Sequence, residues 1–263
     1  MSQPRRVVVV GALGRMGQHV REALRDEPSL RLAAALESPG HAGIGSDLGG
    51  GVIVQDDPKQ ALRGCDVAIE FSVPAAALAL ARVAAEEGVA LVSGTTGLSA
   101  SEREELAEIA KRIPVLATPN FSVAVNVLFW LAREAARRLG PGYDAEIVEV
   151  HHATKRDAPS GTALRLAEAV AEGRGVALEP RLVLERAGET GARPEGAIAV
   201  QTLRGGDNPG EHTLYLLGRG ERLELAHRAA TREHFARGAV RAAAWLAGRP
   251  PGLHRFESVL GIS

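Results

Sequence analysis

A run of valines that leads directly into regularly spaced glycines is the feature that most restricts how this chain can fold. Val7–Val10 lacks polar alternation, which is typical of a strand buried on both faces of a parallel sheet. Gly11–Gly17 follows with the spacing G-x-x-G-x-x-G, and the helical periodicity of Gly14–Arg25 begins within it. Glycines at such a turn let the backbone approach a pyrophosphate, and the N–H groups of the helix start attract its charge. The segment therefore predicts a dinucleotide-binding Rossmann domain.

Strand and helix signals continue to alternate through the first half of the chain. Further strands are expected at Leu30–Leu36, Val67–Phe71, Val89–Val92 and Pro114–Ala117. Helices are expected at Ala75–Glu86, directly after Pro74, and at Ser101–Lys111. Parallel strands require crossover connections, which helices supply, so the pattern predicts a doubly wound α/β sheet.

In the second half, strands follow one another with few helices between them. Two helices, Asn126–Leu139 and Gly161–Ala171, flank an expected strand at Ile147–His152. The strands expected after them are Arg181–Leu184, Ala197–Leu203, His212–Leu217 and Leu223–Arg228. This order predicts a second α+β domain with a mixed sheet. The helical tail Glu233–Leu246 has no strand partner nearby, so we expect it to return to the first domain. The predicted domains are residues 1–122, completed by 233–263, and residues 123–232.

An acidic residue follows the second expected strand, where Rossmann domains bind the adenosine ribose. Glu37 lies 20 residues beyond Gly17. A carboxylate at this position repels a 2′-phosphate, which favours NADH, whereas Arg15 in the glycine loop offsets that charge and admits NADPH. The residues alone leave the choice between NADH and NADPH open.

Small hydrogen-bonding residues end two further strands of the first domain. Gly94–Gly97 follows one strand, and Thr118–Phe121 follows the next. The carboxyl ends of parallel strands line the ligand crevice where the strand order reverses, so we expect both segments to contact the nicotinamide half of a cofactor. A simple turn is the alternative for each segment.

Charge and cysteine content exclude several classes of protein. The formal net charge is −1, with both signs mixed along the chain, so no nucleic-acid partner is expected. No apolar stretch approaches the roughly 18 residues of a membrane span, and the beginning of the chain is typical of a strand rather than a signal peptide. Cys65 is the single cysteine, which fits a reducing compartment. We therefore expect a cytoplasmic protein with no membrane partner.

The segment at residues 149–164, EVHHATKRDAPSGTAL, concentrates chemically active side chains. A histidine is suited to give a proton near neutral pH, and Lys155 supplies a point charge for a carboxylate. Ser160–Thr162 begins the next helix, where hydroxyl and N–H groups receive anions. His151 and His152 are neighbours at a strand end and therefore point to opposite faces, so we expect no metal site. The segment predicts an anion clamp with a general acid, and a capped helix with surface histidines is the alternative.

The same segment closely resembles the signature of the 4-hydroxy-tetrahydrodipicolinate reductase (dihydrodipicolinate reductase) family of bacterial lysine and diaminopimelate synthesis. Residues 10–17, 93–97, 119–126 and 204–213 also resemble this family, in family order, so the resemblance spans nearly the whole chain. It implies NADH- or NADPH-dependent reduction of a cyclic dicarboxylate, the product of dihydrodipicolinate synthase. It also implies a homotetramer built through the sheet of the second domain, which would bind the substrate.

The resemblance further implies roles for individual residues. His151 would be the proton donor, and Lys155 would bind and polarise the substrate. A substrate carboxylate would contact His152, Ser160, Gly161 and Thr162. The dinucleotide would contact Gly11, Ala12, Leu13, Gly14, Arg15, Met16, Glu37, Gly94, Thr95, Thr96, Thr118, Pro119, Asn120 and Phe121.

Two positions depart from the family pattern, and two rival interpretations stay open. Ser38 stands where some members carry an arginine for the 2′-phosphate, which weakens the case for NADPH. Thr118 stands where many members have alanine, and we expect this change to be tolerated. An aspartate- or homoserine-type dehydrogenase would share the Rossmann half, and a non-catalytic NAD(P)H sensor would need only the glycine loop. Neither rival requires the segment His151–Thr162.

Overall fold

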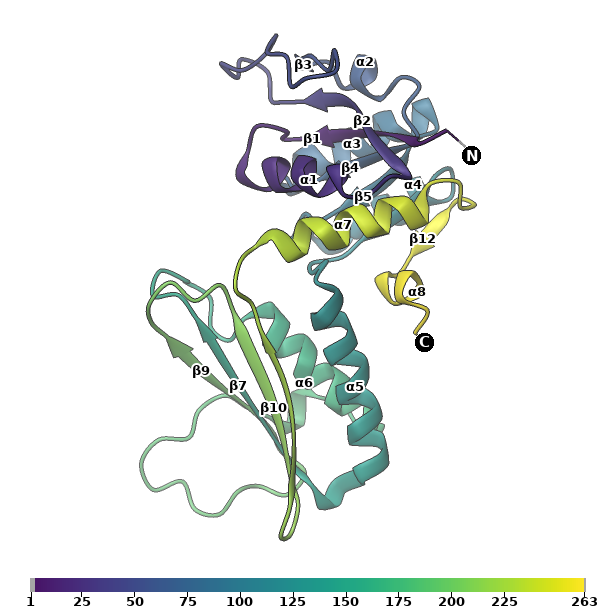
Figure 1. Ribbon diagram of the computed structural model, residues 1–263. Helices are drawn as coiled ribbons and strands as arrows, with labels where there is room; N and C mark the ends of the chain where they lie inside the picture. Colours follow the sequence, from purple (N-terminus) through teal and green to yellow (C-terminus); the bar gives the residue numbers. More distant parts are fainter. Residues whose placement is uncertain (1–2, 263) are drawn as a thin grey trace. The chain divides into compact units, whose positions relative to one another are not determined.

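The computed structural model describes residues 3–262 (Figure 1). Contacts between Cα atoms divide the chain into two compact units. The first unit extends to Val123 and resumes at Glu233, and the second unit is Ala124–Arg232. None of the helices in the described residues is long and apolar enough to cross a membrane.

The first unit is built on a seven-stranded sheet in which every pairing is parallel. Its strands are β1 (Arg5–Val10), β2 (Leu30–Leu36), β3 (Val54–Gln55), β4 (Val67–Glu70), β5 (Ala90–Ser93), β6 (Pro114–Ala117) and β12 (Gly252–His254). Its helices are α1 (Arg15–Arg25), α2 (Pro58–Leu62), α3 (Pro74–Glu87), α4 (Ala100–Ala110), α7 (Glu233–Leu246) and α8 (Phe256–Leu260). The strand order β12-β6-β5-β4-β1-β2-β3 confirms the predicted Rossmann-type sheet.

Helices cover both faces of this sheet, which explains the uninterrupted apolar run in β1. Val7 and Val9 belong to a core that includes residues of α1 and α7, whereas Val8 belongs to a core with α3 and α4. Successive side chains of a strand point to opposite faces, so a strand covered on both faces is apolar throughout. The last long helix, α7, lies beside α1 (Figure 1) and buries Ala239 and Leu246 in the first of these cores.

The second unit has a five-stranded mixed sheet with helices on one face. Its strands are β7 (Asp144–His151), β8 (Leu182–Val183), β9 (Ile198–Arg204), β10 (Glu211–Leu217) and β11 (Arg222–Arg228), in the order β11-β10-β7-β9-β8. Its helices are α5 (Val123–Leu139) and α6 (Gly161–Arg174), with short 3₁₀ turns at Gly140–Gly142 and Glu179–Arg181. β7 runs antiparallel to β10 and parallel to β9. The core between sheet and helices includes Ile147, Leu214 and Leu166, so the predicted α+β architecture with a mixed sheet is confirmed.

Candidate active site

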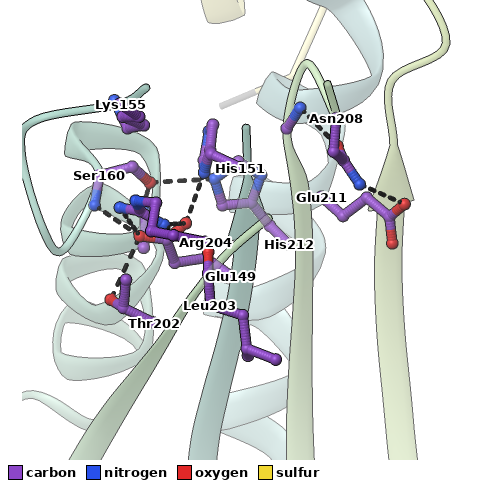
Figure 2. Close-up of polar contacts among 12 residues, drawn as sticks. Glu149, His151, Lys155, Ser160, Thr202, Leu203, Arg204, Asn208, Glu211 and His212 are labelled. Carbon is purple, nitrogen blue, oxygen red and sulfur yellow. Dashed lines mark hydrogen bonds and ion pairs between the residues drawn. The ribbon is translucent and has the colours of Figure 1, made fainter. Parts of the chain in front are cut away.

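A fully buried carboxylate lies at the centre of a polar cluster in the second unit (Figure 2). The alternation of β7 points Glu149 and His151 to the helix-covered face of the sheet. Oε1 of Glu149 accepts hydrogen bonds from the Ser160 N–H at 3.0 Å and from the Thr202 hydroxyl at 3.2 Å. Arg204 donates to both carboxylate oxygens at 2.8 Å, and Nδ1 of His151 contacts Oε2. Two strands and the start of α6 therefore meet at one side chain.

The ionisation of this cluster follows from its hydrogen bonds. Burial alone would raise the pKa of Glu149, but hydrogen bonds from Arg204, His151 and the Ser160 backbone lower it below its ordinary value. Burial lowers the pKa of His151, and contact with Glu149 opposes that decrease. An ionised carboxylate only accepts hydrogen bonds, so Nδ1 of His151 carries a hydrogen and Nε2 is the atom available for chemistry.

Two neighbours lie close to the His151 ring. An ideal Cβ at Gly210 would lie 2.9 Å from Nε2 of His151, and the positive φ of +145° at Gly210 also disfavours a side chain there. The His212 ring meets the His151 ring edge to face, with centroids 5.2 Å apart. Burial lowers the pKa of His212 to about 3, so His212 is neutral at physiological pH.

The other two basic residues of the predicted site lie on the loop after β7. Nζ of Lys155 contacts both carboxylate oxygens of Asp157 at 2.8 Å. The Asp157 side chain is 61% exposed, and a pair so open to water is worth about 0.2–1 kcal/mol. Another carboxylate can therefore replace Asp157 at little cost. His152 is separate from the His151 cluster, since its Nδ1 contacts the Thr154 hydroxyl at 2.8 Å.

The residues at the start of α6 differ in how their polar groups are used. Ser160 is the N-cap: its hydroxyl accepts from the Ala163 N–H at 3.2 Å and contacts Nε2 of His212 at 3.1 Å. Its N–H bonds Glu149, and the residue is buried, so both polar groups of Ser160 are used inside the protein. Gly161 and Thr162 follow as the first helical residues, and Gly161 is exposed. Of the residues at this helix start, Gly161 is the one exposed to solvent.

The glycine loop of the first unit is shaped by close backbone contacts. An ideal Cβ at Gly17 would lie 2.1 Å from the carbonyl oxygen of Gly11 and 2.7 Å from Cα of Ala12. The N–H groups of Gly11 and Ala12 donate to the Leu36 carbonyl at 2.8 and 3.2 Å, and the N–H of Gly14 donates to the Gly11 carbonyl at 3.0 Å. Only glycine at position 17 allows α1 to pack this closely on the loop.

Two groups at this loop are suited to a dinucleotide. Arg15 and Met16 are the first residues of α1, and no acceptor for their N–H groups occurs among residues 3–262. Glu37 lies beside them, because its Oε1 accepts from the Leu13 N–H at 2.7 Å and its Oε2 from the Ser38 N–H at 3.3 Å. Unpaired N–H groups at a helix start suit a pyrophosphate, and a carboxylate with spare lone pairs suits ribose hydroxyls. The donor and acceptor set therefore fits the cofactor that the glycine spacing predicts.

The carboxyl ends of β5 and β6 bring together four of the predicted cofactor residues. Thr95, Thr96, Thr118 and Pro119 line a cavity of about 410 Å³. The Thr95 hydroxyl also donates to the buried Glu70 at 2.9 Å, which fixes the loop after β5.

The remaining cofactor candidates support this region through the backbone and the core. An ideal Cβ at Gly94 would lie 2.2 Å from the Phe71 ring, so this position admits no side chain. The Asn120 side chain accepts from the Ser122 N–H at 2.8 Å. Phe121 is buried and packs edge to face on Phe71 and Phe256, so its ring belongs to the core.

Sequence reasoning gave no role to Glu149, Thr202, Arg204 or His212. One signal was available, since Glu149 and His151 are two residues apart on an expected strand and must share a face. The contributions of Thr202 and Arg204 depend on the register of β9, which places Thr202 opposite Glu149 and Arg204 opposite His151.

Comparisons with known proteins agree over the full length of the chain. Family models described as dihydrodipicolinate reductase, N-terminus, and dihydrodipicolinate reductase, C-terminus, match residues 5–121 and 124–260. A 4-hydroxy-tetrahydrodipicolinate reductase of Anaeromyxobacter dehalogenans is 50% identical, with 98% of each chain covered. The protein of the same name from Myxococcus xanthus is 49% identical, again with 98% of each chain covered.

Solved structures show the same fold at lower identity. A dipicolinate-bound dihydrodipicolinate reductase from Paenisporosarcina superposes with a TM-score of 0.78 at 23% identity, covering 96% of this chain and 97% of the other. GenD2 of gentamicin A biosynthesis, in complex with NAD, superposes with a TM-score of 0.64 at 17% identity, covering 99% and 91%.

Proposed function

This chain belongs to the dihydrodipicolinate reductase family, and from that premise we propose that His151 gives the proton and Lys155 holds the substrate in its reaction. The reaction is the reduction of 4-hydroxy-tetrahydrodipicolinate in lysine biosynthesis, and it uses a nicotinamide cofactor. The dehydrogenase and sensor rivals do not account for full-length relatives at this identity. The roles of individual residues are our proposal.

The carrying observation is the buried pair of Glu149 and His151. When bound, the reduced nicotinamide supplies a hydride to the ring. Because Glu149 occupies Nδ1 of His151, we assign Nε2 as the atom that delivers the accompanying proton. His151 loses the proton at Nε2 to the substrate ring, which gains this proton with the hydride and loses its 4-hydroxyl group as water, and solvent then restores the imidazolium.

Substrate carboxylates would be held by charge and by a helix start. We propose that Lys155 exchanges Asp157 for one carboxylate, and that the N–H groups of Gly161 and Thr162 receive it at the start of α6. Hydrogen bonds to charged groups of this kind are worth about 1.5–3 kcal/mol each. His152 would border the same site, and Ser160 would act indirectly as the cap of the helix.

The cofactor would bind the glycine loop through Arg15 and Met16, with its ribose at Glu37. We infer that NADH is accepted readily, because Glu37 sits at the loop and Ser38 offers no positive charge to a 2′-phosphate. Arg15 is the group available to NADPH. The carboxyl ends of β5 and β6 would receive the nicotinamide half.

We further propose a cytoplasmic homotetramer. Leu203 and Leu217 are exposed on the face of the mixed sheet opposite its helices, which supports association through that sheet. Light scattering of the purified protein would test this, and a monomer across the micromolar range would contradict it.

The activity can be tested by loss of reduced-nicotinamide absorbance, with the unstable substrate made in situ by a coupled synthase from pyruvate and aspartate semialdehyde. NADH and NADPH would be run in parallel, and oxidation should depend on the synthase. His151→Gln should lower turnover about 10²–10⁴-fold while cofactor binding stays unchanged. Near-normal turnover of this variant would remove His151 as the proton donor.

A further inference from the structure

We infer that Glu149 is the positioning residue of the proton donor, and that Arg204 holds this carboxylate in place. The inference rests on the proposed role of His151 and extends it to two residues that would act through His151. It is supported by the complete burial of the Glu149 carboxylate and by the number of hydrogen bonds that this carboxylate accepts.

Glu149 has no exposed surface, and five donor atoms contact its carboxylate. Figure 2 shows Arg204, His151, Ser160 and Thr202 around it. Its Oε1 accepts from Ser160, Thr202 and Nη2 of Arg204. Its Oε2 accepts from Nη1 of Arg204 and contacts Nδ1 of His151. The paired contacts of the guanidinium fix the plane of the carboxylate, so the lone pair offered to His151 has one direction.

This geometry determines which nitrogen of His151 is free and where it points. Nδ1 is held by the carboxylate, so rotation of the ring about χ2 would break that contact. Gly210 leaves room beside Nε2, where an added Cβ would come within 2.9 Å. The ring is thus held at one nitrogen and open at the other, as a directed proton donor requires.

The charges around His151 make Glu149 necessary for a second reason. Burial, and after it Lys155 from the loop and Arg204 from β9, lower the pKa of His151, and His212 from β10 is neutral. Glu149 is the anion that raises it. With this carboxylate in place the net effect is still a lowered pKa of His151, so its loss would lower that pKa further and leave less of the imidazolium that can give a proton.

A buried ion pair is by itself weak evidence of any role beyond structure, so the test needs a readout that structure alone would not move. The ring pKa of His151 can be followed by nuclear magnetic resonance of imidazole-labelled protein in three forms: the unsubstituted enzyme, Glu149→Gln and Arg204→Gln. Glu149→Gln should lower the pKa of His151, because the anion is lost. Arg204→Gln should raise it, because a cation is lost while the carboxylate remains. The proposed arrangement therefore predicts that the two substitutions shift the pKa of His151 in opposite directions.

Steady-state kinetics give the second readout. Glu149→Gln should lower kcat about 10²–10⁴-fold and move the falling limb of its pH profile to lower pH, with the cofactor dissociation constant unchanged. Glu146→Gln is the matched control: it lies on the same strand, faces the other side of the sheet and pairs with Arg193. It should change neither the His151 pKa nor kcat.

An unchanged His151 pKa in both variants, or shifts in the same direction, would overturn the inference. If Glu149→Gln does not fold, the direction of the shift in Arg204→Gln decides alone. Full activity of Glu149→Gln beside an inactive His151→Gln would remove Glu149 and leave the proton donor in place. An active His151→Gln would instead remove the proposed function on which the inference rests.

Discussion

Replacing Gly17 with alanine would put a methyl group where the glycine loop already has backbone. Its Cβ would lie 2.1 Å from the Gly11 carbonyl oxygen and 2.7 Å from Cα of Ala12, and neither atom belongs to a flexible side chain. Relief of these contacts requires α1 and the loop to separate by about 1 Å. Overpacking of this kind costs about 1–3 kcal/mol. If the cost falls on the loop geometry, the dissociation constant for the cofactor rises roughly 5- to 150-fold.

The assay is a fluorescence titration with NADH, paired with a thermal melt of the same samples. Gly142→Ala is the matched control, because an ideal Cβ there has nothing within 4 Å. It should leave both the dissociation constant and the melting temperature unchanged. Gly17→Ala should weaken binding, and its melting temperature should fall by about 2–4 °C per kcal/mol of lost stability. Unchanged affinity with unchanged melting would refute the claim that this close approach shapes the cofactor site.

Three further substitutions test the second unit. Lys155→Ala should lower kcat/KM about 10- to 150-fold through loss of a charge-assisted contact of about 1.5–3 kcal/mol, with NADH affinity unchanged; an unaltered kcat/KM would move the clamp elsewhere. Gly210→Ala should lower kcat by at least about tenfold, because its Cβ meets Nε2 of His151 and its φ is strained; steady-state kinetics on folded protein would show this, and wild-type kcat would contradict it. His212→Asn should make the free energy of unfolding less sensitive to acid, as measured by urea titrations at pH 7 and 5. The pKa of His212 is about 3 in the folded protein and about 6.5 in the unfolded chain, so between these pH values only the unfolded chain binds the extra proton. The free energy of unfolding of the unsubstituted protein therefore falls by up to about 1.4 kcal/mol for each pH unit of acidification in this range. Equal losses in both proteins would show that His212 does not titrate in this way.

Elements that bury a long periodic face were predictable from sequence. The predicted helix Ala75–Glu86 differs from α3 by one residue at each end, and β1 was marked by its valines alone. The elements that were missed are β3, α2, β12 and α8, each of two to five residues. β3 and β12 exist because they pair along the two edges of the sheet, and a segment this short carries no periodic signal of its own.

The residues of the candidate site also differ in whether the local sequence could predict them. His151, Lys155 and the start of α6 lie close together in the chain, so their chemistry could be predicted locally. Arg204 reaches Glu149 only because β9 pairs in parallel with β7 at one particular register. A shift of one residue would point Arg204 to the opposite face of the sheet, and nothing in the local sequence fixes that register.

The return of the chain at Glu233 has a consequence for how the protein is made. A ribosome finishes the whole of Ala124–Arg232 before it has synthesised α7, which covers one face of the first sheet. Until then, the side of the nascent sheet that carries Val7 and Val9 is covered by α1 but not by α7. The later-encoded unit is therefore the first that can be complete, and the earlier-encoded one must wait with an apolar surface open to chaperones or to neighbouring chains. The unit that is synthesised first can therefore be completed only after the second unit, and its apolar surface stays exposed until near the end of translation.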